Sequence, residues 1–233
     1  MLREALAFAR GRDDGIRVLL LGGLFVLTAW LVLPALLVAG YLLSVMDVGA
    51  RGRDRLPPFG NWQRLLVDGL RATVVTLVYG LGPVVVLVGG VLVTWWLVLP
   101  TTGPAIVLDE GAGAFQQLPV EALGLVGLVA FVLLLAAVVF WLHLPAALVA
   151  LGTQGTLGAA FQSDALWTVV NTTAYLKGVV LAGVLFVFGM TVAIPLSAIL
   201  VGFVLQFYVL VAVAFVMGRA VGGGAVTAIK PAE

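Results

Sequence analysis

Long apolar stretches separated by short polar segments dominate the pattern of this chain. Four stretches contain no Asp, Glu, Lys or Arg, and they cover residues 18–46, 72–99, 122–151 and 178–218. A helix needs roughly 20 apolar residues to cross a bilayer core about 30 Å thick. Segments of roughly ten residues that alternate polar and apolar side chains, as a membrane β-barrel would show, do not occur. The pattern therefore predicts membrane-spanning α-helices.

The fourth stretch is too long for a single crossing, because a helix rises 1.5 Å per residue and this stretch has 41 residues. Pro195 lies near its middle. Proline lacks a backbone donor and disfavours helical geometry in the residue before it. We therefore predict two helices, 178–195 and 198–218, joined by a tight turn.

The first stretch, with Pro34 near its middle, has two interpretations. It either crosses the membrane once, or it turns back at Pro34 as a hairpin buried against other helices. Lys and Arg near span ends favour the cytoplasm. A hairpin places all 12 basic residues there, whereas a full crossing leaves the four arginines of residues 1–17 outside. The charges favour the hairpin, and in either case residues 47–71 and the C-terminus are cytoplasmic while residues 100–121 lie outside.

The predicted fold is an all-α, polytopic integral membrane helix bundle with five or six membrane helices, in a single transmembrane domain over residues 1–233. The predicted membrane segments are 18–46, 72–99, 122–151, 178–195 and 198–218. Amphipathic helices in the membrane interface are expected at three polar segments, residues 1–10, 61–71 and 164–177. Asn61 is a plausible N-cap for the second of these helices.

Composition supports the membrane class and offers little chemistry. The chain is 63% hydrophobic and 10% charged, whereas soluble domains are about 45–50% apolar and about 25% charged. A net charge of +1 gives no general field for nucleic acid. With one histidine and no cysteine, a familiar zinc site cannot form. We predict no metal, no cofactor, no catalytic residue and no enzymatic activity.

Two polar side chains inside the predicted spans are candidates for a role in the membrane. His143 lies in the third stretch and could relay a proton or contact a substrate, or it could reach the interface or bond a carbonyl freed by Pro145. Gln206 can form a hydrogen bond between helices. Packing is the simpler interpretation of both residues.

A distinctive run joins the first and second stretches. Residues 55–62 read Arg-Leu-Pro-Pro-Phe-Gly-Asn-Trp and are followed by Leu65 and by Asp68-Gly69-Leu70; Gly40-Tyr41 precedes the run, and residues 155–161 read Gly-Thr-Leu-Gly-Ala-Ala-Phe. This order resembles domain-of-unknown-function family 4013, uncharacterised prokaryotic membrane proteins common in haloarchaea. The resemblance implies a multi-span protein of an archaeal plasma membrane and no established activity. Its motif residues here are Gly40, Tyr41, Pro57, Phe59, Trp62, Asp68, Gly69, Gly158 and Phe161.

Two departures from the family pattern occur, and the motif has a physical interpretation. Ser44 and Gln162 stand where the family often has Arg and an acidic residue, so a charge at either place has no role here. Within the motif, Phe59 and Trp62 are expected to anchor at the interface. Asp68 is placed to pair with Arg64 four residues earlier.

Three functions remain open at this stage. The first is a non-catalytic membrane module that binds the lipid bilayer, a membrane protein partner or a second copy of itself. The second is a small transporter or channel subunit, since Pro and Gly interrupt the spans. The third is a lipid-modifying enzyme that would use His143, Asp164 or the pair Asp109-Glu110.

Overall fold

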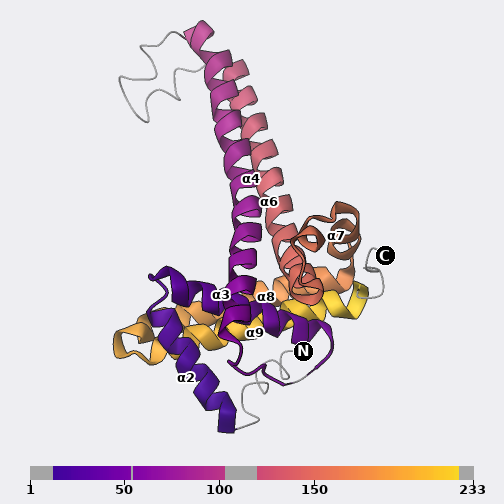
Figure 1. The fold of residues 1–233 in the computed structure, drawn as a ribbon. Helices are drawn as coiled ribbons and strands as arrows, with labels where there is room; N and C mark the ends of the chain where they lie inside the picture. The colour runs from indigo at the N-terminus through magenta and orange to yellow at the C-terminus, as the bar shows by residue number, and fades with distance from the viewer. Residues whose placement is uncertain (1–12, 54, 103–119, 226–233) are drawn as a thin grey trace. The chain divides into compact units, whose positions relative to one another are not determined.

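The computed structural model describes residues 13–53, 55–102 and 120–225. All elements in these ranges are helices, in the order α2 (Asp13–Leu27), α3 (Val32–Ala50), α4 (Trp62–Thr102), α6 (Val120–Gln154), η2 (Leu157–Phe161), α7 (Ser163–Val170), α8 (Thr173–Leu196), η3 (Ser197–Ile199) and α9 (Val201–Ala225) (Figure 1). Five of the described helices, α3, α4, α6, α8 and α9, are long and apolar enough to cross a membrane. The prediction of an all-α membrane helix bundle is confirmed.

The chain forms two compact units. The larger unit combines residues 1–76 with 142–233, and the smaller unit covers residues 77–141. Helices α4 and α6 each contribute to both units. The prediction of one transmembrane domain over residues 1–233 stays a prediction.

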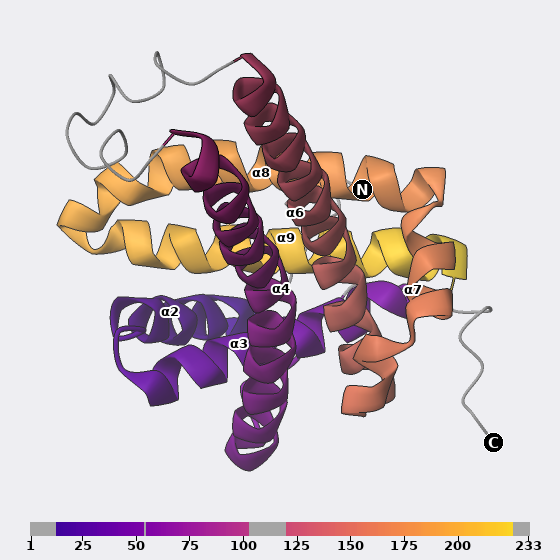
Figure 2. The same cartoon turned by 90° about the horizontal axis from the view of Figure 1, so that it is seen from above.

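The first apolar stretch is divided into α2 and α3, but the break is not at Pro34. It covers residues 28–31, where the Thr28 hydroxyl donates to the Leu24 carbonyl at 2.8 Å and Leu31 is extended. Pro34 is the third residue of α3. The first turn of a helix has no intrahelical partner for its N–H groups, so proline is tolerated there. The predicted turn at Pro34 is therefore wrong in position, although the two helices do run back beside each other (Figure 2).

The fourth stretch divides as predicted. Helix α8 ends at Leu196 directly after Pro195, η3 makes the turn, and α9 starts at Val201. Leu200 has a φ of 63°, a left-handed conformation that lets the chain reverse within four residues. Figure 2 shows α8 and α9 side by side.

The interfacial segments have mixed outcomes. Residues 1–10 lie outside the described residues. Residues 61–71 are helical and run without a break into the span of α4, and Asn61 caps this helix by accepting from the Arg64 amide at 3.1 Å. The single helix expected over residues 164–177 is wrong. Thr172 is extended, and its hydroxyl accepts from the Tyr175 amide at 3.2 Å, so α7 ends and α8 begins here.

Helix α9 forms the centre of the larger unit and contacts α2, α3 and α8. Phe207, Phe215 and Val211 on α9 are fully buried. Glycines bring the backbones of α3 and α9 close together, since a Cβ at Gly218 would lie 2.2 Å from the Met46 carbonyl oxygen. Close approach through small residues is the usual way in which membrane helices pack.

The smaller unit is a pair of helix segments, one from α4 and one from α6. Tyr79 meets Phe140 edge to face with ring centroids 6.3 Å apart, and Gly82 lies beside the same phenylalanine. Large apolar side chains such as Leu92 and Leu134 remain exposed on both segments. Such surfaces suit contact with lipid.

Candidate functional site: a charged pocket beside an aromatic cluster

The motif residues of α3 and of the following loop meet in the larger unit. Tyr41 stacks face to face on Phe59, with ring centroids 4.1 Å apart and 10° between the ring planes. The Tyr41 hydroxyl donates to the Pro57 carbonyl at 3.1 Å. Phe207 of α9 lies 6.0 Å from Phe59 and 5.6 Å from Tyr41, centroid to centroid. The loop that carries the two prolines is thus fixed against α3 and α9.

Trp62 extends this aromatic cluster toward the surface. Its ring lies 6.2 Å from Phe59 and meets Phe25 of α2 edge to face at 5.8 Å. Trp62 is 44% exposed, whereas Tyr41 and Phe207 are fully buried. Phe59 therefore docks the loop inside the unit, and Trp62 is the member of the cluster that reaches the surface.

Two motif glycines allow α3 and α4 to cross at close range. A Cβ at Gly40 would lie 2.0 Å from the Leu65 carbonyl oxygen, and a Cβ at Gly69 would lie 1.9 Å from the Leu36 carbonyl oxygen. No real Cβ tolerates such distances, so any other residue would push the two helices apart. This crossing places the first turns of α4 against α3.

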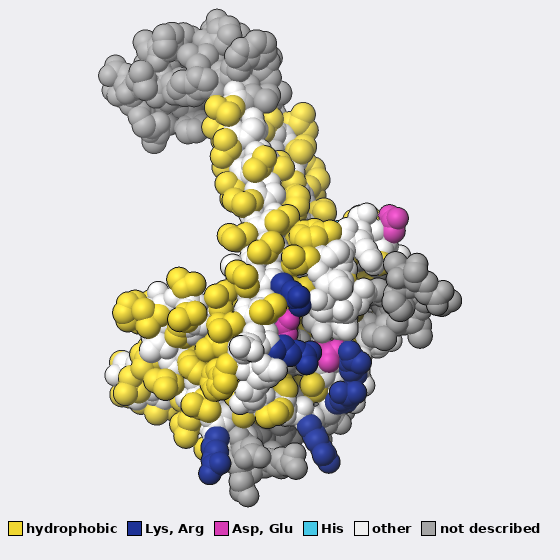
Figure 3. Space-filling view, viewed as in Figure 1, with side chains coloured by type: hydrophobic (Ala, Val, Ile, Leu, Met, Phe, Trp, Pro, Cys, Tyr) yellow, Lys and Arg dark blue, Asp and Glu magenta, His cyan; other side chains and the backbone are white. Residues whose placement is uncertain are grey.

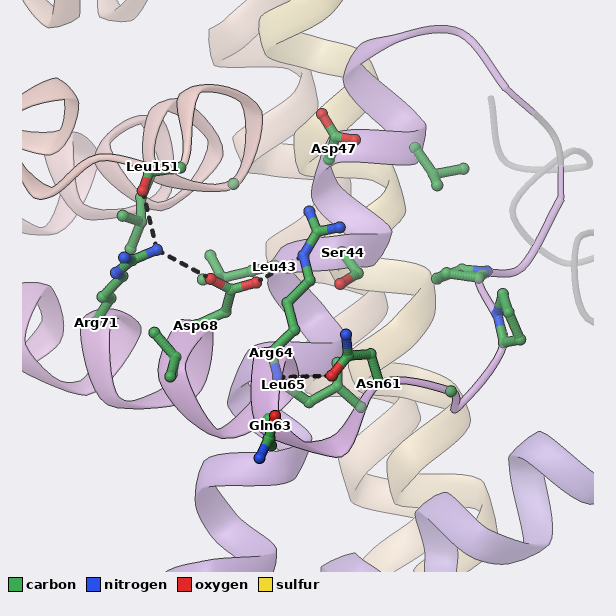
Figure 4. Close-up of a pocket in the computed structure, with 17 residues that line it drawn as sticks. Leu43, Ser44, Asp47, Asn61, Gln63, Arg64, Leu65, Asp68, Arg71 and Leu151 are labelled. Atoms are coloured by element: carbon green, nitrogen blue, oxygen red, sulfur yellow. Dashed lines mark hydrogen bonds and ion pairs between the residues drawn. The ribbon is translucent and has the colours of Figure 1, made fainter.

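A polar pocket of about 630 Å³ lies beside this crossing, within the larger unit (Figure 4). The end of α3, the loop before α4, the first turns of α4 and the end of α6 surround it. Its polar lining consists of Ser44, Asp47, Asn61, Gln63, Arg64, Asp68 and Arg71. The pocket therefore lies at the ends of these helices and not at the middle of their apolar runs.

Asp68 links two arginines that line the pocket. One carboxylate oxygen lies 3.4 Å from Arg64 Nε and the other lies 3.3 Å from Arg71 Nη1. Arg71 also donates to the Gly155 carbonyl at 3.0 Å, which ties α4 to the turn after α6. Asp68 thus orients two guanidinium groups of one helix, as Figure 4 shows.

A second ion pair lies at the end of α3. Asp47 is 2.6 Å from Arg51 Nε, and Arg51 donates to the Thr153 carbonyl at 3.3 Å. Together with Arg64, Arg71 and Asp68, this pair brings the ion pairs of this region to three guanidinium groups and two carboxylates. These five side chains carry one excess positive charge. Figure 3 shows basic side chains gathered around the lower part of the larger unit, with acidic side chains among them.

Arg64 is the most exposed of the three arginines in these ion pairs. Its side chain is 75% exposed. The hydrogen bonds that it makes to described residues use the backbone amide and Nε. Its two terminal amino groups make none with the described part of the chain, and so they remain available to an anion in the pocket.

The family comparison covers most of this region. A family model described as "Protein of unknown function (DUF4013)" matches residues 23–201. The chain belongs to this family. No curated protein and no solved structure matches the chain. The DUF4013 match begins within α2 and ends at the first residue of α9, so it includes the pocket, the helix crossing and every member of the aromatic cluster except Phe207.

The other predicted residues of this DUF4013 protein lie away from the pocket lining. Gly158 belongs to η2, where a Cβ would meet nothing within 4 Å, and Phe161 is 42% exposed. His143 stacks on Trp167 of α7, with ring centroids 5.5 Å apart. The carbonyl of Leu142, just before it, accepts from the Tyr175 hydroxyl. The Tyr175 hydroxyl therefore ties α8 to α6 beside His143.

Gln206 forms a side-chain hydrogen bond within the α8–α9 pair. Its amide nitrogen donates to the Ser197 hydroxyl at 2.7 Å, and that hydroxyl donates to the Ala193 carbonyl at 3.0 Å. This arrangement satisfies two polar side chains at the turn between α8 and α9. It suits packing, because each polar group already has a partner inside the protein.

Sequence reasoning missed part of the pocket. Asp47 and Arg71 line the pocket and were not predicted as site residues, nor was Gly155, which the folding of α6 brings to α4. A usable signal existed in the five arginines of residues 47–71. Among the described residues, no group of three or more His, Cys, Asp or Glu side chains could hold a metal ion.

Proposed function

We propose that this protein is a non-catalytic membrane module whose pocket binds the anionic headgroup of a membrane lipid. The observation that carries the proposal is Arg64, whose exposed guanidinium keeps its terminal amino groups available at the mouth of a charged pocket. A guanidinium recognises a phosphate through two parallel hydrogen bonds. Asn61 and Gln63 in the same lining carry amide groups that can add donors.

The surroundings of the pocket favour a lipid over a free phosphate. Val67 lines the pocket and is 48% exposed, and Leu70 on the next turn is 56% exposed. An acyl chain can lie along this apolar surface while its phosphate contacts Arg64. Trp62, exposed at the start of the same helix, is suited to the headgroup layer.

Binding is also better supported than passage through the membrane. A transporter site lies near the bilayer midplane between broken helices. This pocket lies instead at the ends of the apolar runs of α3, α4 and α6. The archaeal plasma membrane and the cytoplasmic position of residues 47–71 remain predictions that accompany the proposal.

Native mass spectrometry of the full chain tests the proposal. The purified protein is titrated with phosphatidylglycerol and, separately, with phosphatidylcholine of the same acyl chains. We expect preferential retention of phosphatidylglycerol, and about a tenfold loss for Arg64→Gln, since a hydrogen bond to a charged group contributes about 1.5–3 kcal/mol. Glycerol phosphate serves as a third ligand; if it competes at equal concentration, the pocket binds a soluble phosphate and not a lipid.

Arg53→Gln is the matched control. Arg53 is exposed, lies in the loop before α4 and does not line the pocket. It carries the same charge as Arg64, so a general electrostatic attraction would weaken equally in both variants. Equal losses, or equal retention of the two lipids by the unchanged protein, would contradict the proposal.

A further inference from the structure

Both helical hairpins of the larger unit turn within apolar sequence. The turn of α2–α3 exposes Trp30 by 81% and Val32 by 73%. The turn of α8–α9 exposes Ile199 by 64% and Leu200 by 63%. Turns that reach water are normally rich in Gly, Asn, Asp and Ser. Large exposed apolar side chains at both turns indicate an apolar environment.

Several polar groups of both turns have partners inside the protein. The Thr28 hydroxyl donates to the Leu24 carbonyl, and the Leu31 amide donates to the Thr28 carbonyl at 2.9 Å. In the other hairpin, Ser197 bonds Ala193 and Gln206 as described, and its carbonyl accepts from the Leu200 amide at 3.2 Å. Such internal pairing is what hydrocarbon requires, because it offers no water to an open backbone group.

The two turns lie at the same end of the unit, and the charges lie at the other. Gly23 of α2 lies against Val204 of α9, one turn from each reversal. At the opposite end, Gly49 of α3 lies against the Phe215 carbonyl. Figure 2 shows both reversals on one side. The described charged residues of these four helices, from Arg17 onward, are Arg17, Asp47, Lys177 and Arg219.

The charge-free part of α3 falls short of a full crossing, and that of α9 is at the lower limit of one. Residues 32–46 of α3 are 15 in number and span about 22 Å, and residues 201–218 of α9 are 18 in number and span about 27 Å. The hydrocarbon core is about 30 Å thick, and any tilt shortens the reach further. Helix α3 is long enough to cross only when Asp47 and the residues after it are included.

We infer that both hairpins enter the membrane from the side of their charged ends and end inside the hydrocarbon. Lipid acyl chains then cover Trp30 and Val32 at one turn and Ile199 and Leu200 at the other. The inference does not depend on lipid headgroup binding at the pocket, because the turns lie at the opposite end of α3. The two exposed apolar turns are thus assigned to contact with lipid.

Site-directed spin labelling measures the depth directly. The chain contains no cysteine, so Trp30→Cys, Ile199→Cys and Arg53→Cys each give one labelling site without a prior substitution. The labelled full chains are reconstituted into phosphatidylglycerol–phosphatidylcholine vesicles. We expect the nitroxides at positions 30 and 199 to collide more with oxygen, which concentrates in hydrocarbon, than with a water-soluble nickel chelate. Position 53 should show the reverse order.

Impermeant maleimide gives a second readout in cells that express the full chain. Cysteines at 30 and 199 should stay unlabelled in intact and in permeabilised cells and react fully in detergent, whereas the cysteine at 53 reacts once permeabilisation exposes its side. Labelling of position 30 or 199 in intact cells, or greater collision of either nitroxide with the nickel chelate than with oxygen, would overturn the inference. Both substituted side chains are exposed, so the fold should persist, which circular dichroism checks.

Discussion

The rings of Tyr41 and Phe59 stack with their centroids 4.1 Å apart and their planes within 10°, and so join the middle of one membrane helix to the loop that leads into the next. Eighteen positions separate them in the chain. The contact is strengthened by the hydrogen bond from the Tyr41 hydroxyl to the Pro57 carbonyl. The Gly-Tyr pair and the Leu-Pro-Pro-Phe run of the motif are therefore two halves of one docking contact.

Two substitutions at Tyr41 should measure the contributions of the hydrogen bond and of the ring stacking separately. Tyr41→Phe keeps the ring and leaves the Pro57 carbonyl without its donor, so we expect a loss of about 1 kcal/mol in unfolding free energy. Tyr41→Ala removes a fully buried ring and should cost about 3–5 kcal/mol. Unfolding of the purified protein in mixed micelles, followed by circular dichroism, measures both values. Equal losses would show that the ring stacking contributes nothing.

The crossing of α3 and α4 should be intolerant of any side chain at Gly69. Gly69→Ala places a Cβ 1.9 Å from the Leu36 carbonyl oxygen, so the helices must separate. We expect a loss of about 1–3 kcal/mol, as in other overpacked sites. Gly60→Ala is the control within the same motif, since its Cβ would meet nothing within 4 Å. Similar stability of the two variants in thermal unfolding would rule out a tight crossing.

Asp68 should limit the affinity of the pocket for anions. Asp68→Asn removes a negative charge 3.3–3.4 Å from Arg64 and Arg71. We expect retention of phosphatidylglycerol to rise several-fold, and unfolding free energy to fall by less than about 1 kcal/mol because both pairs are partly exposed. Native mass spectrometry against the unchanged protein measures the first effect. A decrease in retention would show that the carboxylate itself contacts the ligand.

The Ser197–Gln206 pair should show strong non-additivity. Ser197→Ala leaves the amide of Gln206 without its acceptor, and we expect a loss of about 1–2 kcal/mol. Gln206→Leu removes the polar group and should be nearly neutral. The double variant should resemble Gln206→Leu alone, because the unpaired amide is gone. Additive losses in the unfolding free energies would show that the two side chains do not interact.

Much of the fold follows from local pattern. The stretches without charge predict the helices because hydrocarbon admits no unpaired backbone, and the division after Pro195 follows from the missing amide of proline. The same reasoning misplaced the first break, since Pro34 sits in the first turn of α3, where its missing amide has no cost. The position of a proline within a helix, and not its presence alone, decides its effect.

The candidate site, too, could be predicted from the sequence only in part. The motif residues and the pairing of Arg64 with Asp68 could be read from spacing along one helix. The pocket could not, because Arg71 bonds Gly155 across 84 positions and Arg51 bonds Thr153 across 102. Such contacts exist only once α3, α4 and α6 have packed.

By itself the sequence determined that this chain is a helical membrane protein, where its long apolar helices lie, and where its arginines concentrate. These properties depend on the solvent and on neighbours within a few turns. Only the tertiary structure decided that Tyr41 meets Phe59, that Gly40 and Gly69 form a crossing, and that charges from α3 and α4 line one pocket closed by the end of α6. Packing decides those relationships, because they depend on which helix faces meet, and many apolar faces in this chain are chemically alike.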